Sequence, residues 1–350
     1  MKKAKRILAF TLMLVMLVAL VGANTAYAIK EKKGDYTLTF YHIFAAEESG
    51  GHESLWINKA VAEVEKQTEG HLKIDVVPAS AMGGESELIP QVAAGTVDMT
   101  LSGPSVYGDI LHIDQIGWSE LPYVVDNYDQ MNALGEILPE LTNKQLEEAG
   151  INLYCLGAMS QGIRCLCTVE KYPVKTVADC DGLRIRVPES DVYMNTVAGW
   201  GCAPTAMGSS QVITSLSNGT IEGLESDPAS ILARGQQEAF HWYTETYHIA
   251  SLNLLMINKD NLMQLPEDLR QVLIDVFKDY CVQQCYDRAI VNAALLEDIK
   301  AAGVEVITPT EEAFAAFKDA DTPFRDAKIA EWGDEEIFAE AQAYVAERVG

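Results

Sequence analysis

Residues 36–102 alternate between strand-like and helix-like patterns, and this alternation restricts the possible folds more than any other feature of the sequence. Strand-like runs are separated by helix-like segments that end at a glycine. The strand-like runs are residues 36–46, 71–79 and 96–105, and the helix-like segments are residues 50–70 and 83–95. An order of strand, helix, strand, helix and strand is typical of a parallel or mixed sheet with helices on its faces. The sequence therefore predicts an α/β fold.

A second stretch repeats this order farther along the chain. Two strand-like runs lie on either side of Ser160–Gly162, and a third run, two helix-like segments and a short strand follow them. The runs are residues 151–160, 162–170, 183–188 and 220–226, and the helix-like segments are residues 190–201 and 209–219. The motifs GTVDMT (95–100) and GTIEGL (219–224) occupy equivalent places in the two stretches. Each stretch therefore predicts its own α/β domain.

Residues 266–302 predict one long helix, with Pro266 in its first turn and Gly303 after its end. At 1.5 Å per residue, roughly 37 residues would run about 55 Å, which exceeds one domain of this size. We therefore expect the helix to span both domains, with the acidic segment after it packed on the body as amphipathic helix. Domain I is expected to comprise residues 29–158 and about 247–283, and domain II residues 159–246 and about 284–350.

The chain opens with four basic residues, an apolar run and the small-residue motif AYA (26–28). This order is typical of a secretory signal peptide, whereas a retained membrane anchor would need a longer apolar run. We expect cleavage after Ala28, a mature chain that begins at Ile29, and export to the periplasm. No later run is long and apolar enough to predict a membrane span.

Charge and cysteine content exclude several classes of partner. The chain carries 51 acidic and 26 basic residues, a formal net charge of −25, which disfavours nucleic acid or an anionic membrane surface as a partner.

Seven cysteines lie at or after Cys155, so at least one thiol is left unpaired. Neither they nor the scattered histidines have metal-ligand spacing. We expect no metal, no cofactor and mostly buried thiols, while disulfide pairing stays open because export permits it.

No motif predicts an enzyme. AMSQG (158–162) resembles a nucleophile elbow around Ser160, but its first glycine is absent and a strand-like run follows it instead of a helix. GHES (51–54) lacks the second histidine of a zinc protease, and GWGCAP (199–204) lacks the third glycine of a dinucleotide-binding loop. A secreted hydrolase therefore stays only as an alternative.

Two arginines of this acidic chain, Arg184 and Arg186, lie in the strand-like motif GLRIRVP (182–188). Residues two apart in a strand point to one face, and like charges side by side are mildly unfavourable. The arrangement suggests an anionic partner, or else pairing with surface carboxylates. In an exported two-domain α/β protein it favours a solute-binding protein that closes around a small anion, because an arginine fork holds a carboxylate by two hydrogen bonds.

A series of motifs runs in order along nearly all of the mature chain. The motifs lie in residues 72–105, 120–125, 162–190, 203–226 and 257–273, and they include ELPYVV, GLRIRVP and INKDNLMQLP. This series resembles the extracytoplasmic solute receptors of TRAP transporters, the DctP family. The resemblance implies the two-domain fold of periplasmic solute-binding proteins, a small organic acid as ligand, and a small and a large membrane subunit as partners. An ABC-type solute receptor is the alternative among binding proteins.

The resemblance also implies roles for individual residues. Arg186 stands where the family's arginine binds the ligand carboxylate, Arg164 stands where a second polar contact is frequent, and Arg184 replaces a lysine and is expected to be peripheral. Further ligand contacts are expected among residues near strand ends and in matching motifs: Tyr41, His42, Ser102, Gly103, Trp118, Ser209, Glu225, Ser226 and Asp227.

Small residues replace aromatic or amide side chains at three matching positions, Ala203, Ser209 and Ser226. Such walls offer few partners for ligand hydroxyls. We therefore expect a simple monocarboxylate or dicarboxylate, with Tyr41, His42, Trp118 or Trp200 helping to fill the pocket, and not a hydroxyl-rich sugar acid.

Overall fold

The structure is a computed structural model that describes residues 35–333 and 335–349; the expected signal peptide, residues 1–28, lies outside them. Over these residues the strands form one mixed sheet in the order β2-β1-β3-β8-β4-β7-β5-β6, with β9 paired to β8. The strands are β1 (Tyr36–Tyr41), β2 (Leu72–Val77), β3 (Met99–Ser102), β4 (Leu153–Thr168), β5 (Arg184–Val187), β6 (Ala203–Ala206), β7 (Gly223–Ser226), β8 (Trp242–Asn258) and β9 (Glu305–Ile307). The predicted mixed α/β sheet is confirmed.

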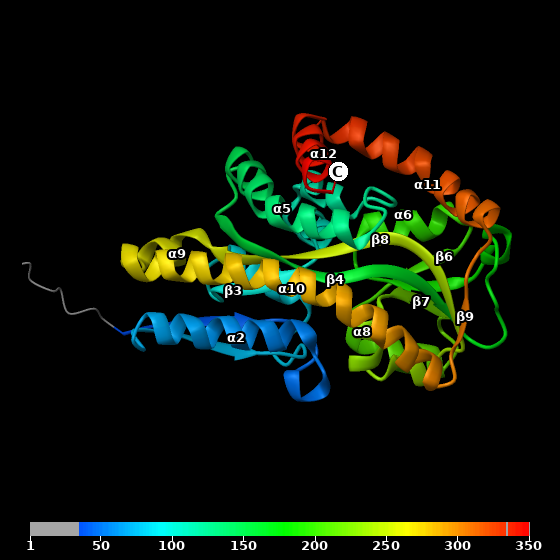
Figure 1. Ribbon diagram of the computed structural model, residues 1–350, viewed down its shortest axis with the longest axis horizontal. Coiled ribbons are helices and arrows are strands. Elements are labelled where there is room, and N and C mark those ends of the chain that lie inside the picture. The colour runs from blue at the N-terminus through cyan, green and yellow to red at the C-terminus, as the bar shows by residue number, and fades with distance from the viewer. Residues whose placement is uncertain (1–34, 334, 350) are drawn as a thin grey trace, which may run out of the picture. The chain divides into compact units, whose positions relative to one another are not determined.

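Two long antiparallel strands, β4 and β8, run through the middle of the sheet (Figure 1). They pair from Leu153 opposite Asn258 to Thr168 opposite Trp242, with three shifts of register. The two runs predicted on either side of Ser160–Gly162 are therefore one strand, and that prediction was wrong. A shift of register between Ser160 and Gly162 explains the error, because the bulge there places a glycine with φ of 117° inside the strand.

Helices flank the sheet, and the longest is α10 (Glu267–Ala301), which confirms the helix predicted for residues 266–302. It packs against β4, α2, α5 and α8, and Figure 1 shows it running along the sheet. The other α-helices are α2 (His52–Gln67), α3 (Glu85–Ala93), α4 (Pro104–Leu111), α5 (Tyr128–Glu148), α6 (Asp191–Gly199), α7 (Val212–Ser217), α8 (Pro228–Ala233), α9 (Lys259–Gln264), α11 (Glu311–Trp332) and α12 (Glu335–Val349). Short 3-10 helices are η1 (Glu47–Ser49), η2 (Asp114–Glu120), η3 (Val177–Cys180), η4 (Ser209–Gln211) and η5 (Gln236–Glu238).

The acidic C-terminal segment forms two helices, α11 and α12. Gly333 ends α11 in the left-handed conformation, with φ of 69°. α11 packs against α6, and α12 packs against α5. The predicted amphipathic segment is thus helical and packed on the body, as expected.

Apolar clusters lie on both halves of the sheet. Phe40 and Phe277 belong to one that covers β1, β2 and β3, while Ile185 and Trp200 belong to one beside β5. The predicted boundaries of domains I and II stay a prediction, because β4 and β8 belong to both halves. All seven cysteine side chains are buried, which agrees with the sequence-based expectation, and their pairing stays open.

Candidate functional site

A small cavity of about 40 Å³ lies where β4 and β8 meet the ends of β3 and β5. Six charged or amide side chains line it: Glu85, Gln161, Arg164, Arg186, Arg234 and Asn253. Two outer depressions, of about 290 and 530 Å³, share Ile43 and Ser209 with its lining. The cavity thus adjoins two larger depressions and concentrates three arginines of a strongly acidic chain.

Arg186 enters the cavity from β5, whose apolar residues Ile185 and Val187 are fully buried. Its guanidinium is also buried and donates from Nε and Nη2 to the backbone oxygen of Met207, at 3.0 and 2.6 Å. No carboxylate of the described residues lies within 4.0 Å of it. Burial lowers the pKa of Arg186 to about 10, because the charge has lost much of its hydration. Met207 therefore orients a cation whose charge is uncompensated by any ion pair.

Arg184, two residues earlier in the same strand, is exposed. It forms an ion pair with Glu222 at 3.2 Å and donates to the backbone oxygens of Thr220 and Gly219. The structure thus places Arg184 at the surface, as the sequence suggested, and Arg186 in the cavity.

Arg164 reaches the same cavity from β4, but its charge is paired. Its guanidinium donates to both carboxylate oxygens of Glu225 and, at 2.8 Å, to the backbone oxygen of that residue. The ring of Tyr193 lies 5.1 Å from the guanidinium carbon. Burial opposes ionisation of Glu225, yet Arg164 and His248 together hold its pKa below the ordinary value. Glu225 is therefore a buried carboxylate that positions Arg164.

His248 completes this arrangement from β8. Its Nε2 lies 3.4 Å from Oε2 of Glu225, and its Nδ1 lies 2.9 Å from Oγ1 of Thr246. Burial lowers the pKa of His248, so the imidazole stays neutral at neutral pH. Its ring also meets Trp200 edge-on, with ring centres 4.9 Å apart.

Sequence reasoning missed Glu85 and Arg234. Glu85 opens α3 and accepts a hydrogen bond from Oγ of Ser102, and burial raises its pKa. Arg234 ends α8, and burial lowers its pKa. One feature of the sequence could have indicated Glu85 as a site residue. It follows two glycines at the start of a helix, where a side chain can reach the end of a neighbouring strand.

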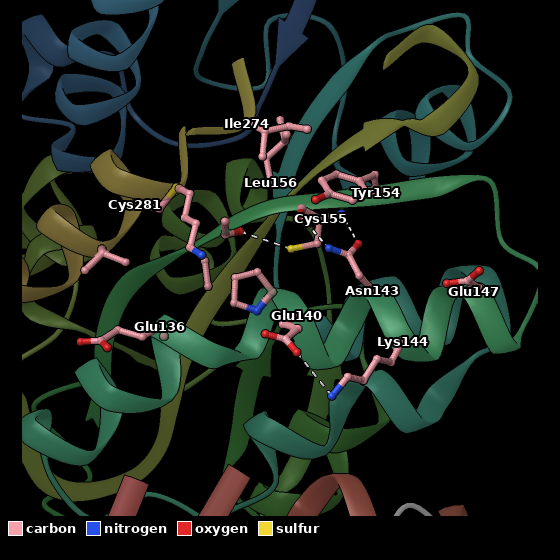
Figure 2. A pocket seen from close by; sticks show the side chains of 16 residues that line it. Glu136, Glu140, Asn143, Lys144, Glu147, Tyr154, Cys155, Leu156, Ile274 and Cys281 are labelled. Atoms are coloured by element: carbon pink, nitrogen blue, oxygen red, sulfur yellow. Dashed lines mark hydrogen bonds and ion pairs between the residues drawn. The ribbon is translucent and has the colours of Figure 1, made fainter. Parts of the chain in front are cut away.

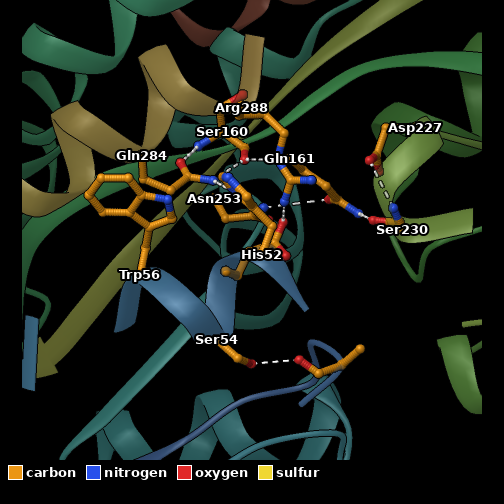
Figure 3. Close-up of polar contacts among 12 residues, drawn as sticks. His52, Ser54, Trp56, Ser160, Gln161, Asp227, Ser230, Asn253, Gln284 and Arg288 are labelled. Atoms are coloured by element: carbon orange, nitrogen blue, oxygen red, sulfur yellow. Dashed lines mark hydrogen bonds and ion pairs between the residues drawn. The ribbon is translucent and has the colours of Figure 1, made fainter. Parts of the chain in front are cut away.

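A neutral polar wall faces the arginines, and it too was missed. Oε1 of Gln161 accepts from Oγ of Ser251 at 3.2 Å, and Nε2 of Gln161 donates to Ser230 at 2.8 Å. Asn253 lies 3.5 Å from the same Gln161 oxygen, and Figure 3 shows these two amides beside each other. The hydroxyl of Tyr193 donates to Glu120 at 2.7 Å. This wall presents amides and hydroxyls that can donate or accept hydrogen bonds.

A buried polar network continues from this wall to α10. Gln284 accepts from the backbone N–H of Ser160 and donates to the backbone oxygen of Ser160, both at 2.7 Å. His52 on α2 lies 3.1 Å from the Gln284 amide nitrogen, and Arg288 donates to the same Ser160 oxygen at 3.1 Å. Figure 3 shows Ser160 between Gln284 and Gln161. The β4 bulge beside the cavity is therefore held by the long helix.

The predicted site residues fall into three groups. Arg164, Arg186, Gly103 and Ser209 line the cavity. Glu225 and Ser102 are one hydrogen bond behind it. The residues that the structure does not place in its lining are Tyr41, His42, Trp118, Ser226, Asp227 and Trp200.

Three of this last group have evident structural contacts. His42 is fully buried with its ring centre 5.4 Å from that of Phe40. Trp118 packs edge-on against Phe338 of α12. Asp227 caps α8 by accepting from the N–H of Ser230 at 3.0 Å. Trp118 was predicted to contact the ligand because it is aromatic and was expected near the cleft. The sequence did not show that α12 packs against this side chain.

A larger groove of about 370 Å³ lies between α5, β4 and α10 (Figure 2). Asn143 bridges its floor by bonding both backbone groups of Cys155. Its charged lining consists of Glu136, Glu140, Glu147, Lys144 and Lys278, and Lys144 is paired with Glu140 at 3.5 Å. Because this lining carries no excess of positive charge, the arginine-lined cavity is the better candidate site for an anion.

Residues 43–331 match the family described as bacterial extracellular solute-binding protein, family 7, also named DctP. The chain belongs to this family. The resemblance seen in the sequence is thereby confirmed. Family 7 consists of solute-binding proteins, not enzymes.

Among the described residues, none of the helices has both the length and the apolar character that crossing a membrane requires. Within the same residues, no cluster of side chains could hold a metal ion.

Relatives of this family 7 protein include a solute-binding protein of Roseobacter denitrificans, 29% identical over 87% of this chain and 90% of the relative. The 2,3-diketo-L-gulonate-binding periplasmic protein YiaO of Escherichia coli is 27% identical over 73% of this chain and 76% of its own length. A TRAP periplasmic solute-binding protein of Citrobacter koseri, solved with bound D-glucuronate, has a TM-score of 0.74 and 26% identity, covering 89% of this chain and 98% of that one. The overall fold is therefore that of TRAP solute receptors.

Proposed function

We propose that this protein is the extracytoplasmic receptor of a TRAP transporter and captures a small hydroxylated carboxylic acid where the arginine-lined cavity meets the two larger depressions. The observation that carries the proposal is Arg186. Its guanidinium is buried and oriented by the Met207 carbonyl, yet no carboxylate of the described chain pairs with it. A buried charge without a partner is costly, so the arrangement suits a ligand that brings its own carboxylate.

The rest of the cavity favours hydroxyl groups over a second carboxylate. Glu85 can accept hydrogen bonds from ligand hydroxyls, and its carboxylate offsets the charge of Arg234 in the same lining, so little positive charge is left for a second carboxylate. Gln161 and Asn253 offer amides opposite. The sequence had suggested a simple acid, because the small residues Ala203, Ser209 and Ser226 offer few partners for hydroxyl groups. The polar wall is instead formed by other residues, Gln161 and Asn253 among them. The ligands named for the Escherichia coli and Citrobacter koseri proteins, 2,3-diketo-L-gulonate and D-glucuronate, belong to this class.

Capture is proposed to close domain I (residues 29–158 and about 247–283) on domain II (residues 159–246 and about 284–350). The cavity draws Glu85 from one proposed domain and Arg186 from the other, which supports this division. The closed receptor would deliver its ligand to the small and large membrane subunits, and export with cleavage after Ala28 would place it in the periplasm with them.

Ligand carried through purification tests the proposal. Protein is purified without added acid and denatured, and the released compound is identified by mass. An intact hydroxylated acid supports the proposed class, while a compound altered by the protein on re-addition would indicate an enzyme. A thermal-shift screen of uronates and aldonates against C4 dicarboxylates follows, because a true ligand raises the melting temperature with log concentration. Shifts with dicarboxylates alone would refute the role given to Glu85.

A further inference from the structure

Two of the seven cysteines, Cys180 and Cys202, meet where the chain enters β5. Cys180 is the last residue of η3, and Cys202 lies between α6 and β6. The backbone segments that carry them are hydrogen-bonded to each other. The N–H of Gly182 donates to the oxygen of Gly201 at 2.9 Å, and the N–H of Ala203 donates to the oxygen of Leu183 at 2.7 Å.

The close approach continues at the residues next to both cysteines. A Cβ atom placed on Gly201 would lie 3.6 Å from the Cα atom of Asp181. Cys180 and Cys202 belong to the same apolar cluster and are 0% and 7% exposed. The neighbouring Cys202 thiol, together with burial, raises the pKa of Cys180. The two side chains are therefore neighbours in one apolar cluster.

We infer that Cys180 and Cys202 form a disulfide bond in the exported protein. The inference depends on export to an oxidising compartment, where disulfides form and persist. It does not depend on the ligand proposed above.

The other close pairs are less suited to a bond. Cys281 and Cys285 lie one turn apart on α10, which puts their Cβ atoms about 5–6 Å apart. Cys165 and Cys167 lie two apart on β4, a rise of about 7 Å. A disulfide needs Cβ atoms about 3.8 Å apart, so neither pair meets the requirement without a change of backbone.

The oxidant is a disulfide, either of a protein or of a small molecule. One cysteine thiol loses its proton and attacks a sulfur of the oxidant, which releases one oxidant thiolate and leaves a mixed disulfide. The second cysteine then loses its proton and attacks the protein sulfur of the mixed disulfide, releasing the other oxidant thiolate. The protein loses two protons and two electrons, and the oxidant gains them as two thiols. Because both thiols are buried in the folded protein, the exchange takes place before the cluster closes.

The bond would fix the start of β5, the strand that carries Arg186. η3 and the turn at Gly182 would be tied to the start of β6, which pairs with β5 in parallel from Arg184 opposite Ala203 to Val187 opposite Ala206. Both ends of this small strand pair would then be held, one by the disulfide and the other by the Arg186–Met207 hydrogen bonds.

Alkylation of the exported protein tests the inference. Full-length chain is expressed with its own residues 1–28, collected from the exported fraction, and treated with N-ethylmaleimide in denaturant without reductant. Of the seven thiols, all except those of Cys180 and Cys202 should be modified, and prior reduction should make all seven reactive. Trypsin should release peptide 176–184 linked to peptide 187–234, each of which contains a single cysteine.

A second measurement covers the case in which the chain is not exported in the host. The chain is refolded from denaturant in a glutathione redox buffer, and the same linked peptides are sought. The melting temperature of the oxidised protein should fall by roughly 5 °C or more after reduction with a phosphine, and the Cys180→Ala/Cys202→Ala variant should not respond. Cys285→Ala, a matched control, should keep the response. Seven reactive thiols in both preparations, or a link between other cysteines such as Cys155 and Cys281, would overturn the inference.

Discussion

Arg164 donates hydrogen bonds to both carboxylate oxygens and to the backbone oxygen of Glu225, whereas its neighbour in the cavity, Arg186, bonds only to a backbone carbonyl. The two arginines thus differ in charge balance although both are buried. Arg164 is neutralised inside the protein by Glu225, whereas no carboxylate of the described residues pairs with Arg186, which the proposal assigns to the ligand. This difference gives each a separate experimental signature.

Substitution of Arg186 should abolish most ligand affinity. Arg186→Ala removes the proposed carboxylate partner and should weaken binding by about 2–5 kcal/mol, and Arg186→Lys should also weaken it because the bidentate fork is lost. Titration calorimetry with the acid recovered from the protein measures both. Arg184→Ala is the matched control, since this exposed arginine lies two residues away and pairs with Glu222. Equal losses for Arg184→Ala and Arg186→Ala would contradict the assignment.

His42 should make the fold less stable in mild acid. Burial lowers its pKa from 6.5 to about 4, and neither ring nitrogen has a hydrogen-bond partner. Between about pH 6.5 and pH 4 the unfolded chain binds a proton at His42 and the folded chain does not. The free energy of unfolding therefore falls as the pH drops through this range, by roughly 3 kcal/mol in all. His42→Leu should flatten this dependence in urea unfolding curves. His241→Gln, at a partly exposed position, is the control, and an unchanged slope for His42→Leu would exclude this origin.

Asp321 should act in the opposite direction. Burial raises its pKa to about 8, although the Trp200 indole N–H donates to it at 2.9 Å. The folded chain holds a proton that the unfolded chain releases above about pH 4, so stability falls as pH rises from about 4 to 8. Asp321→Asn removes the titration and should add roughly 4 kcal/mol at pH 7. Thermal unfolding across this range measures it, with the exposed Asp319→Asn as control; parallel curves for Asp321→Asn and the native chain would refute the burial argument.

Gln284 should couple the long helix to the β4 bulge. Gln284→Leu leaves the buried N–H of Ser160 without an acceptor and removes the partner of His52 Nδ1, whereas the Ser160 oxygen keeps its bond from Arg288. One orphaned buried donor costs about 1–3 kcal/mol. We expect lower stability and faster amide exchange around Gln161. The neighbouring Gln283→Leu, at an exposed position, should change neither, and slow exchange at Gln161 in the Gln284→Leu variant would argue against the coupling.

The sequence predicted the elements whose pattern is local. α10 was found almost to the residue because Pro266 and Gly303 bound a long amphipathic run. β8 (Trp242–Asn258) was missed because its second half is buried throughout, so no alternation separates it from a buried helix. The division of β4 followed from Gly162, which breaks the strand pattern in the sequence but not in the sheet.

The site was predicted where motifs carried it and missed where packing built it. Arg164 and Arg186 stand in recognisable motifs, and both line the cavity. Gln161 was passed over because it lay in the apparent gap between two strands. Arg234 joins the cavity only through the placement of α8, which no local pattern specifies.

The continuous β4–β8 ladder would store elastic energy in the proposed receptor. If domains I and II close on a ligand, the strands that cross between them must bend and twist while still hydrogen-bonded from Leu153–Asn258 to Thr168–Trp242. The work of that deformation would be returned when the ligand leaves and would drive reopening. The binding free energy would then be the contact energy reduced by this work, so substitutions that soften the bulge at Gly162 should tighten binding without touching the ligand.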